Sequence, residues 1–168
     1  MSTNRKRTIP MKLRSLAFVL AASLANLAYA DTRSDRLDVQ HVMDAYHEAV
    51  LSHDGDRLAA LFLPTSIWLN VLSDQAYAAA REKSADAPKI RVGSYASFAK
   101  LVSTSKASFN PTHTRQQISS DGTIASVYFD FVFMIDGKPT NRGSETWQLV
   151  KDSDGWYIAA LTYSSDPM

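Results

Sequence analysis

Three polar side chains of the chain could carry out acid–base chemistry: Tyr46, His113 and Glu145. A carboxyl or imidazole group can transfer a proton near neutral pH when its surroundings adjust its pKa. A tyrosine hydroxyl can donate a hydrogen bond to negative charge that develops on a substrate. We therefore treat Glu145 or His113 as a candidate general acid or base, and Tyr46 as a candidate hydrogen-bond donor.

Tyr46 and His113 also have simpler structural interpretations. Tyr46 lies on the apolar face of a predicted helix, where a tyrosine can be a core residue whose hydroxyl is satisfied by a neighbour. His113 shares one face of a predicted strand with Phe109 and Pro111. Such a histidine can simply be a hydrogen-bonding strand residue. Both interpretations stay open at the level of sequence.

Glu145 shares one face of a predicted strand with Trp147 and Leu149, because side chains alternate along a strand. A carboxyl group on such a face is either buried with a raised pKa, which is typical of a functional site, or paired with a cation. The candidate cations are Arg142 and Arg115. We hold both possibilities open.

The sequence predicts neither a metal nor another cofactor. His41, His47 and His53 recur at six-residue steps, which scatters them around a helix instead of giving the i, i+4 spacing of a metal pair. We interpret these three histidines as solvated. The chain contains no cysteine, so thiolate ligands and disulfides are excluded, and it has no phosphate-binding glycine loop or dinucleotide motif.

The first part of the chain predicts helices followed by a strand. Apolar residues recur at three- and four-residue steps over residues 35–53, which indicates an amphipathic helix. A short second helix follows, and Pro64 is expected to end it. Residues 66–72 alternate and favour a strand, with Trp68 and Asn70 on one face.

The middle of the chain contains a segment of uncertain role. Residues 75–83 are rich in alanine and favour a helix, and residues 84–88 form a cluster of helix breakers. Residues 75–89 could be a lid over a cavity or a surface insertion. The helical pattern that follows, over residues 95–102, presents Phe98 on its apolar face.

The last part of the chain predicts a β-meander. Four alternating segments, at 109–118, 123–135, 142–151 and 156–164, are separated by turns that contain Asp and Gly. The predicted class is α+β, with N-terminal helices packed in a curved, mostly antiparallel sheet. Such a sheet forms a cone-shaped half-barrel with a central cavity.

The sequence of several segments resembles the nuclear transport factor 2-like superfamily. This superfamily includes SnoaL-like, ketosteroid-isomerase-like and lumazine-binding-like proteins. The resemblance rests on Tyr46–Phe62, Pro64–Asn70, and Gly143–Lys151 with Gly155–Ile158, and it covers roughly residues 35–165. It implies the half-barrel fold. It implies no particular activity, because this fold carries many functions.

The resemblance to the ketosteroid isomerases implies a partial site. Tyr46 falls at the position of their oxyanion-donating tyrosine, and Glu145 falls near their second, protonated donor. Asn70 stands where those enzymes have the catalytic aspartate. An amide cannot accept a proton near neutral pH, so the isomerase mechanism through this position is not expected.

Residues 1–30 have the order of a Sec signal peptide: a basic stretch, an apolar run and small residues before Ala30. We expect cleavage after Ala30, which leaves one domain at residues 31–168 without a membrane anchor. Translation could start at Met1 or at Met11. The expected location is the bacterial periplasm or the medium.

The charge of the mature domain argues against nucleic acid as a partner. Residues 1–30 hold five of the 18 basic residues and none of the 17 acidic ones, which leaves 13 basic against 17 acidic residues in the remainder. A mildly acidic domain lacks the basic surface that phosphates require.

These observations lead to one preferred function and two alternatives. The preferred function is an exported domain that holds a small apolar or aromatic molecule in its cavity. The expected cavity residues are Tyr46, Trp68, Asn70, Phe98, His113, Glu145 and Trp147. The alternatives are a cofactor-free isomerase, cyclase or dehydratase that uses Glu145 or His113, and a dimeric interaction module without chemistry. In each case we expect a homodimer formed through the sheet.

Overall fold

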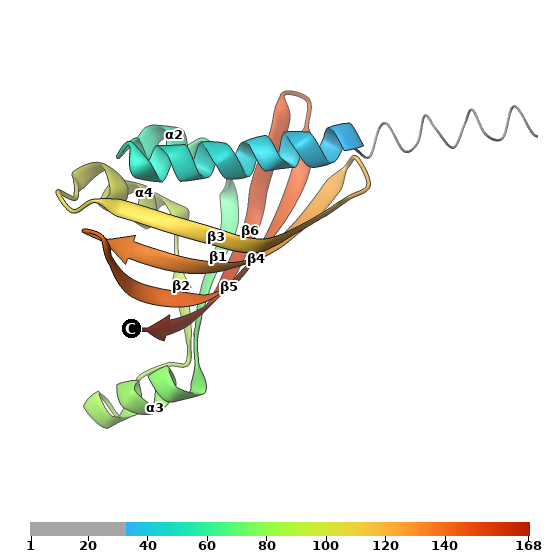
Figure 1. Cartoon of the computed structure of the whole chain (residues 1–168). Coiled ribbons are helices and arrows are strands. Elements are labelled where there is room, and N and C mark those ends of the chain that lie inside the picture. The colour runs from blue at the N-terminus through green and yellow to red at the C-terminus, as the bar shows by residue number, and fades with distance from the viewer. Residues whose placement is uncertain (1–32) are drawn as a thin grey trace, which may run out of the picture.

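The computed structural model describes residues 33–168, and the predicted signal peptide and its cleavage site lie outside the described residues. Six strands form one curved sheet in the order β2-β1-β6-β5-β4-β3. Neighbouring strands are antiparallel except β1 and β6, which are parallel. A long helix over residues 33–51 crosses the concave side of this sheet (Figure 1). The α+β half-barrel predicted from the sequence is confirmed.

The helix at residues 33–51 faces the sheet through a buried stripe. Val39, Met43, Tyr46 and Val50 recur at steps of three and four residues and are all buried. This spacing places them on one side of the helix, against the concave face of the sheet. The helix therefore both closes the core and carries Tyr46 inward.

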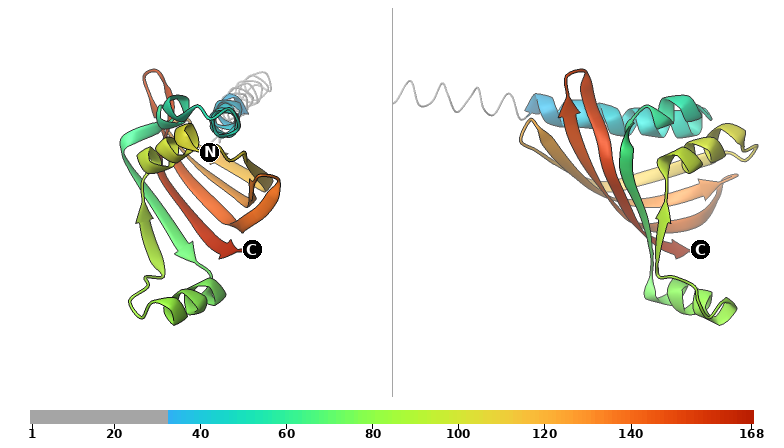
Figure 2. Two further views of the ribbon diagram at one scale, coloured as in Figure 1. Left: turned by 90° about the vertical axis from the view of Figure 1, so that its left-hand side faces the viewer. Right: turned by 180° about the vertical axis from the view of Figure 1, so that it is seen from behind.

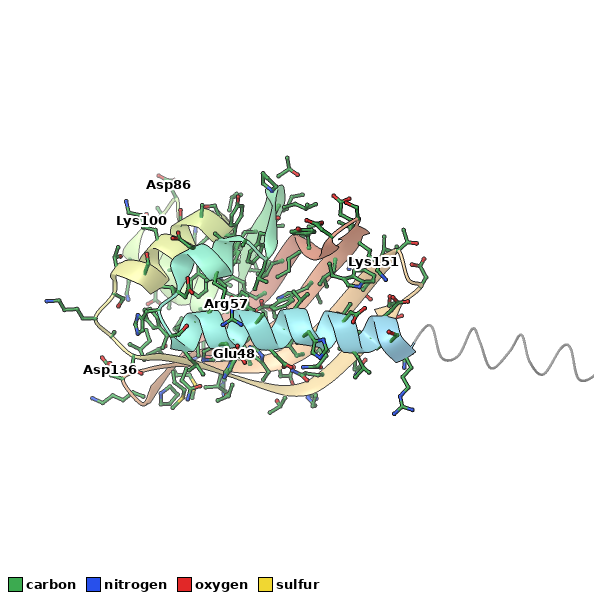
Figure 3. The ribbon with its side chains drawn as sticks, turned by 90° about the horizontal axis from the view of Figure 1, so that it is seen from above. Glu48, Arg57, Asp86, Lys100, Asp136 and Lys151 are labelled. Carbon is green, nitrogen blue, oxygen red and sulfur yellow. The ribbon has the colours of Figure 1, made fainter. Side chains whose placement is uncertain are left out.

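A tight corner joins this helix to α2 (Gly55–Ala59). His53 takes a positive φ of 59°, and the side chain of Asp54 accepts a hydrogen bond from the backbone N–H of Arg57 at 2.9 Å, which caps α2. Glu48 and Arg57 form an ion pair of 2.7 Å between the two helices (Figure 3). The corner is thus held by a cap and a cross-helix contact.

The strand β1 (Phe62–Leu72) begins earlier than the sequence predicted. The expectation that a helix runs to Pro64 is wrong, because Phe62 is already in the strand and is buried against Trp68 and Tyr95. Pro64 is exposed and lies where the pairing with β6 shifts register, between Phe62 and Ile67. A proline is tolerated at such an irregularity.

The segment after β1 forms an arm. The helix α3 (Asp74–Lys83) has no buried residue, and it connects to the short edge strand β2 (Ile90–Gly93). Figure 2 shows β1 and β2 extending away from the other helices to reach α3. The four residues of β2 are too few to give a recognisable alternation, so the sequence did not predict this strand. The predicted helix that follows is present as α4 (Tyr95–Thr104).

The predicted β-meander is present as β3 (Phe109–Ser120), β4 (Ile124–Ile135), β5 (Lys138–Asp152) and β6 (Gly155–Pro167). The turn between β4 and β5 has positive φ at both central residues, 51° at Asp136 and 75° at Gly137. That geometry matches the two-residue turns that Asp-Gly favours.

An ion pair with a buried carboxylate connects the first helix to the far end of the sheet. Asp35 is buried, with 6% of its surface exposed, and one of its carboxylate oxygens lies 2.9 Å from Nζ of Lys151 on β5. Figure 3 places Lys151 at the end of the sheet next to the start of the described helix. Together with the corner at Asp54, this contact fixes the helix along its whole described length.

Candidate functional site

A cavity of about 240 Å³ lies between the first helix, α4 and the concave face of the sheet. Most of its wall is apolar, formed by Trp68, Phe98, Leu101, Pro111, Phe131 and Phe133. Polar groups complete the wall: Tyr46, His113, Asn141, Glu145 and Tyr163. An apolar cavity with a few convergent polar groups is typical of a small-molecule site.

The structure brings together five of the seven residues that the sequence proposed for the cavity: Tyr46, Trp68, Phe98, His113 and Glu145. The other two do not line it. Each of them still contacts a lining residue.

Trp147 was expected in the cavity wall, but it is fully buried behind Tyr46, with their ring centroids 5.0 Å apart. Trp147 lies in the middle of β5, between β4 and β6, and its side chain packs into the core between the sheet and the first helix. Asn70 was also expected in the wall. It lies on the same sheet face beside Tyr163, which is its partner in the pairing of β1 with β6.

Glu145 is the acid of the site. The indole Nε1–H of Trp147 donates a hydrogen bond of 2.5 Å to Oε1 of Glu145. Burial raises the pKa of Glu145 to about 7, although the bond from Trp147 acts in the opposite direction. The carboxyl group is therefore close to half protonated at neutral pH, as a general acid or base requires.

The two arginines considered as partners of Glu145 lie elsewhere. Arg142 pairs with Asp166, and Arg115 pairs with Asp130. The sequence left open whether Glu145 is paired with a cation or is buried with a raised pKa. In the structure the carboxyl group is buried and its pKa is raised.

Tyr46 can act only as a hydrogen-bond donor or acceptor, not as an acid. Burial raises the pKa of its hydroxyl well above the usual value, and the nearby Glu145 and Tyr163 raise it further. Its ring packs between Trp147 and Phe98, with centroids 5.0 and 6.3 Å away. This packing fixes the direction of the hydroxyl toward the cavity wall that carries Glu145.

Tyr163 is a cavity residue that the sequence analysis missed. It is the direct partner of Glu145 in the pairing of β5 with β6. Burial raises the pKa of its hydroxyl, hydrogen bonds with the side chains of Asn70 and Trp68 lower it, and Glu145 raises it again. A regular register from the turn at Asp152 and Gly155 would pair Glu145 with Thr162. A bulge between Gln148 and Leu149 shifts the partner of Glu145 to Tyr163.

His113 stands at the edge of the cavity, and its ring meets the ring of His47 in a T-shaped, edge-on arrangement. Burial, with a smaller contribution from the neighbouring His47, lowers the pKa of His113 to about 4. The two rings are 5.8 Å apart. His113 is therefore a neutral imidazole at neutral pH. It can exchange a hydrogen bond with a ligand, but it carries no charge.

The interpretation of three histidines as solvated is wrong for two of them. His47 is half-buried against His113, and Nδ1 of His53 lies 2.9 Å from the carbonyl oxygen of Val102. His41 is exposed as expected. Within residues 33–168, no group of three histidine, aspartate or glutamate side chains is arranged to hold a metal ion.

The segment considered as a lid does not cover the cavity. No residue between 74 and 89 lines it, and α3 lies apart from the first helix and α4 (Figure 1). The rim is formed instead by Leu101 of α4, which has half of its surface exposed.

Solved structures with the same fold identify the class of the chain. A proposed aromatic ring hydroxylase from Novosphingobium aromaticivorans is 19% identical, with a TM-score of 0.58 over 80% of this chain and 94% of that chain. A proposed dehydratase of the NTF2-like family from Streptomyces avermitilis is 17% identical, with a TM-score of 0.59 over 81% and 97%.

A third similar structure is an NTF2-like protein with a cystatin-like fold, also from Novosphingobium aromaticivorans. It is 15% identical, with a TM-score of 0.57 over 86% of each chain. At these identities the likeness establishes the fold alone, and the chain has the nuclear transport factor 2-like (NTF2-like) fold. No protein-family model and no curated protein matches the sequence. None of the helices within residues 33–168 is both long and apolar enough to span a membrane.

The shifted pKa values of Glu145 and His113 predict opposite effects of pH on stability. The folded protein holds the proton of Glu145 up to about pH 7, whereas an ordinary glutamate loses it near 4.5. Stability therefore falls between these two values, by up to about 3 kcal/mol. For His113 the unfolded chain holds the extra proton between about pH 4 and 6.5, so stability rises over that interval.

We expect the two effects to oppose each other in the wild type and to separate in variants. Urea denaturation at pH 5, 6, 7 and 8 measures the free energy of unfolding. In Glu145→Gln this free energy rises with pH more than in the wild type, and in His113→Asn it falls more. Profiles for both variants that run parallel to the wild type would show that neither group has a shifted pKa.

Proposed function

We propose that this protein is an exported domain that binds a small aromatic or apolar molecule in its cavity. The observation that carries the proposal is the apolar cavity of about 240 Å³ with polar groups gathered on one wall. A cavity of about 150 Å³ can hold benzene. The space here therefore suits one ring with a few substituent atoms.

The polar wall would fix the orientation of such a ligand. The hydroxyl of Tyr46 and the protonated form of Glu145 can both donate a hydrogen bond to a ligand oxygen. Their proximity is supported by the effect of Glu145 on the pKa of Tyr46, where it adds to the larger effect of burial. A ring with a carbonyl or hydroxyl substituent would place its oxygen between these two groups.

Filling the cavity mouth should abolish binding without unfolding the protein. Leu101 lies at the rim and is half exposed, so Leu101→Trp adds bulk there with little cost to the core. We expect 4-hydroxybenzaldehyde to bind the wild type in calorimetric titration, and we expect the variant to bind at least about tenfold more weakly, the loss of about 1.4 kcal/mol.

The matched control is Ile124→Trp, which adds similar bulk at an exposed position on β4 far from the cavity residues. It should bind like the wild type. Equal binding by Leu101→Trp and the wild type, or no aromatic ligand bound by the wild type and none co-purified with it, would contradict the proposal.

A second candidate function is acid–base catalysis without a cofactor, by an isomerase, cyclase or dehydratase. The specific observation in its favour is the pKa of about 7 that burial gives Glu145 inside the cavity. In this scheme Glu145 transfers the proton, and Tyr46 stabilises the negative charge that develops on the substrate oxygen. Asn70 offers no base.

Glu145→Gln separates catalysis from binding, because glutamine keeps the size and the hydrogen bonding of the side chain but cannot transfer a proton. If the protein is an enzyme, this variant should bind its substrate as before and lose about 10²-fold or more in turnover. Turnover is followed by mass spectrometry of the bound metabolites. No turnover of any bound ligand by the wild type would exclude this candidate.

We also propose that the chain forms a homodimer through the convex face of its sheet. Ile67, Ile90 and Val92 expose 57%, 58% and 83% of their surface, and their positions in the β1–β2 pairing put them on the face opposite Trp68 and Asn70. Sedimentation should give a dimer at tens of micromolar. A monomer at that concentration would contradict the proposal. A dimer with no ligand in any assay would favour the interaction module.

Export is proposed from the order of charged, apolar and small residues before Ala30. Protein recovered from the periplasm or the medium should have Asp31 as its first residue. Recovery only in the cytoplasm, with the first thirty residues intact, would contradict this location.

A further inference from the structure

Four side chains form one row across the concave face of the sheet. The strand pairings join Arg91 to Asn70, Asn70 to Tyr163, and Tyr163 to Glu145. Paired residues in a sheet point to the same face. The row therefore runs from the exposed edge strand β2 to the acid in the cavity wall.

Arg91 at the end of this row is a cation without a partner. Within the described residues it forms no ion pair with a carboxylate, in contrast to Arg142 and Arg115 of the same sheet. Its charge nevertheless acts on Tyr163, which lines the cavity. Burial is the main influence on the pKa of Tyr163 and raises it, whereas the positive charge of Arg91 lowers it. An exposed guanidinium on the strand next to a ligand cavity can receive an anion.

One wall of the cavity contacts the strand that carries Arg91. Trp68 lines the cavity and is paired with Gly93, which is two residues from Arg91 on β2. A Cβ at Gly93 would come within 2.7 Å of the Trp68 ring, so the glycine lets this ring lie against β2. A ligand stacked on Trp68 would therefore lie beside β2, the strand of Arg91.

We propose that the ligand of this cavity is an aromatic carboxylate, with its ring against Trp68 and its carboxylate bound by Arg91. The inference rests on the proposed binding function and deepens it. A guanidinium suits this role because it binds a carboxylate through two parallel hydrogen bonds. Asn70 and Tyr163 lie between Arg91 and Glu145 in the row. They separate a carboxylate bound at Arg91 from Glu145, which limits the repulsion between the two acids.

Asn70 has a role in this arrangement. Its amide N–H₂ can donate a hydrogen bond to the second oxygen of a bound carboxylate. An aspartate at this position would neutralise Arg91 and repel the anion. An amide at position 70 therefore leaves this edge of the sheet suited to an anionic group.

Two probes that differ only in charge test the inference: 3-phenylpropanoate and the neutral 3-phenylpropanamide. Calorimetric titration of the exported protein should show the carboxylate bound about tenfold more tightly than the amide, the order expected for one charged hydrogen-bonded contact. Arg91→Gln should remove this preference by weakening only the carboxylate. Asn70→Asp should also weaken the carboxylate more than the amide.

The control is Arg81→Gln, which removes an exposed arginine on α3 that has no ion pair within the described residues. It should leave both affinities unchanged. Equal affinities for the two probes in the wild type, or an equal loss of both in Arg91→Gln, would overturn the inference but leave the cavity as a binding site. No binding of either probe would contradict the binding function itself, and the inference with it.

Discussion

The rest of the site depends on the placement of one carboxyl group, Glu145, in an apolar wall. Within residues 33–168, the side-chain hydrogen bond to this carboxyl group comes from the indole of Trp147, which is itself fully buried. One neutral hydrogen bond does not compensate for the loss of water around a carboxylate, so burial raises the pKa to about 7. The neighbouring hydroxyls of Tyr46 and Tyr163 respond to this group through their own pKa values, although burial is the larger cause for both. The cavity is thus a place where protonation, hydrogen bonding and ligand charge are coupled.

The architecture holds this group in place from both sides. The curved sheet sets Glu145 and Tyr163 side by side through the β5–β6 pairing. The first helix brings Tyr46 over them, and its position is fixed by the Asp35–Lys151 ion pair at one end and the capped corner at Asp54 at the other. The aromatic rings between helix and sheet then occupy most of the interior and leave a cavity large enough for a single ring.

Much of the fold could be predicted from the sequence, because the strongest signals in it are local. The helical stripe that contains Tyr46 and the Asp-Gly turn at Asp136 both reappear in the structure. The errors arose where tertiary contacts override local preference. Phe62 is drawn into a strand by its aromatic neighbours although a helix-like pattern leads into it. The short strand β2 exists only through its pairing with β1.

The candidate site was predicted in part, for a related reason. Glu145, Tyr46 and His113 could be proposed from residue type and face, and they do border one cavity. Tyr163 could not, because a bulge shifts the register of the β5–β6 hairpin. Arg91 could not, because its position depends on the unpredicted pairing of β2 with β1. The most direct test of the account is a ¹³C NMR titration of the Glu145 carboxyl group, with and without a bound aromatic ligand. A titration midpoint near pH 7 that moves when the ligand binds is the predicted result. A midpoint at the ordinary glutamate value of 4.5, unchanged by any ligand, would contradict it.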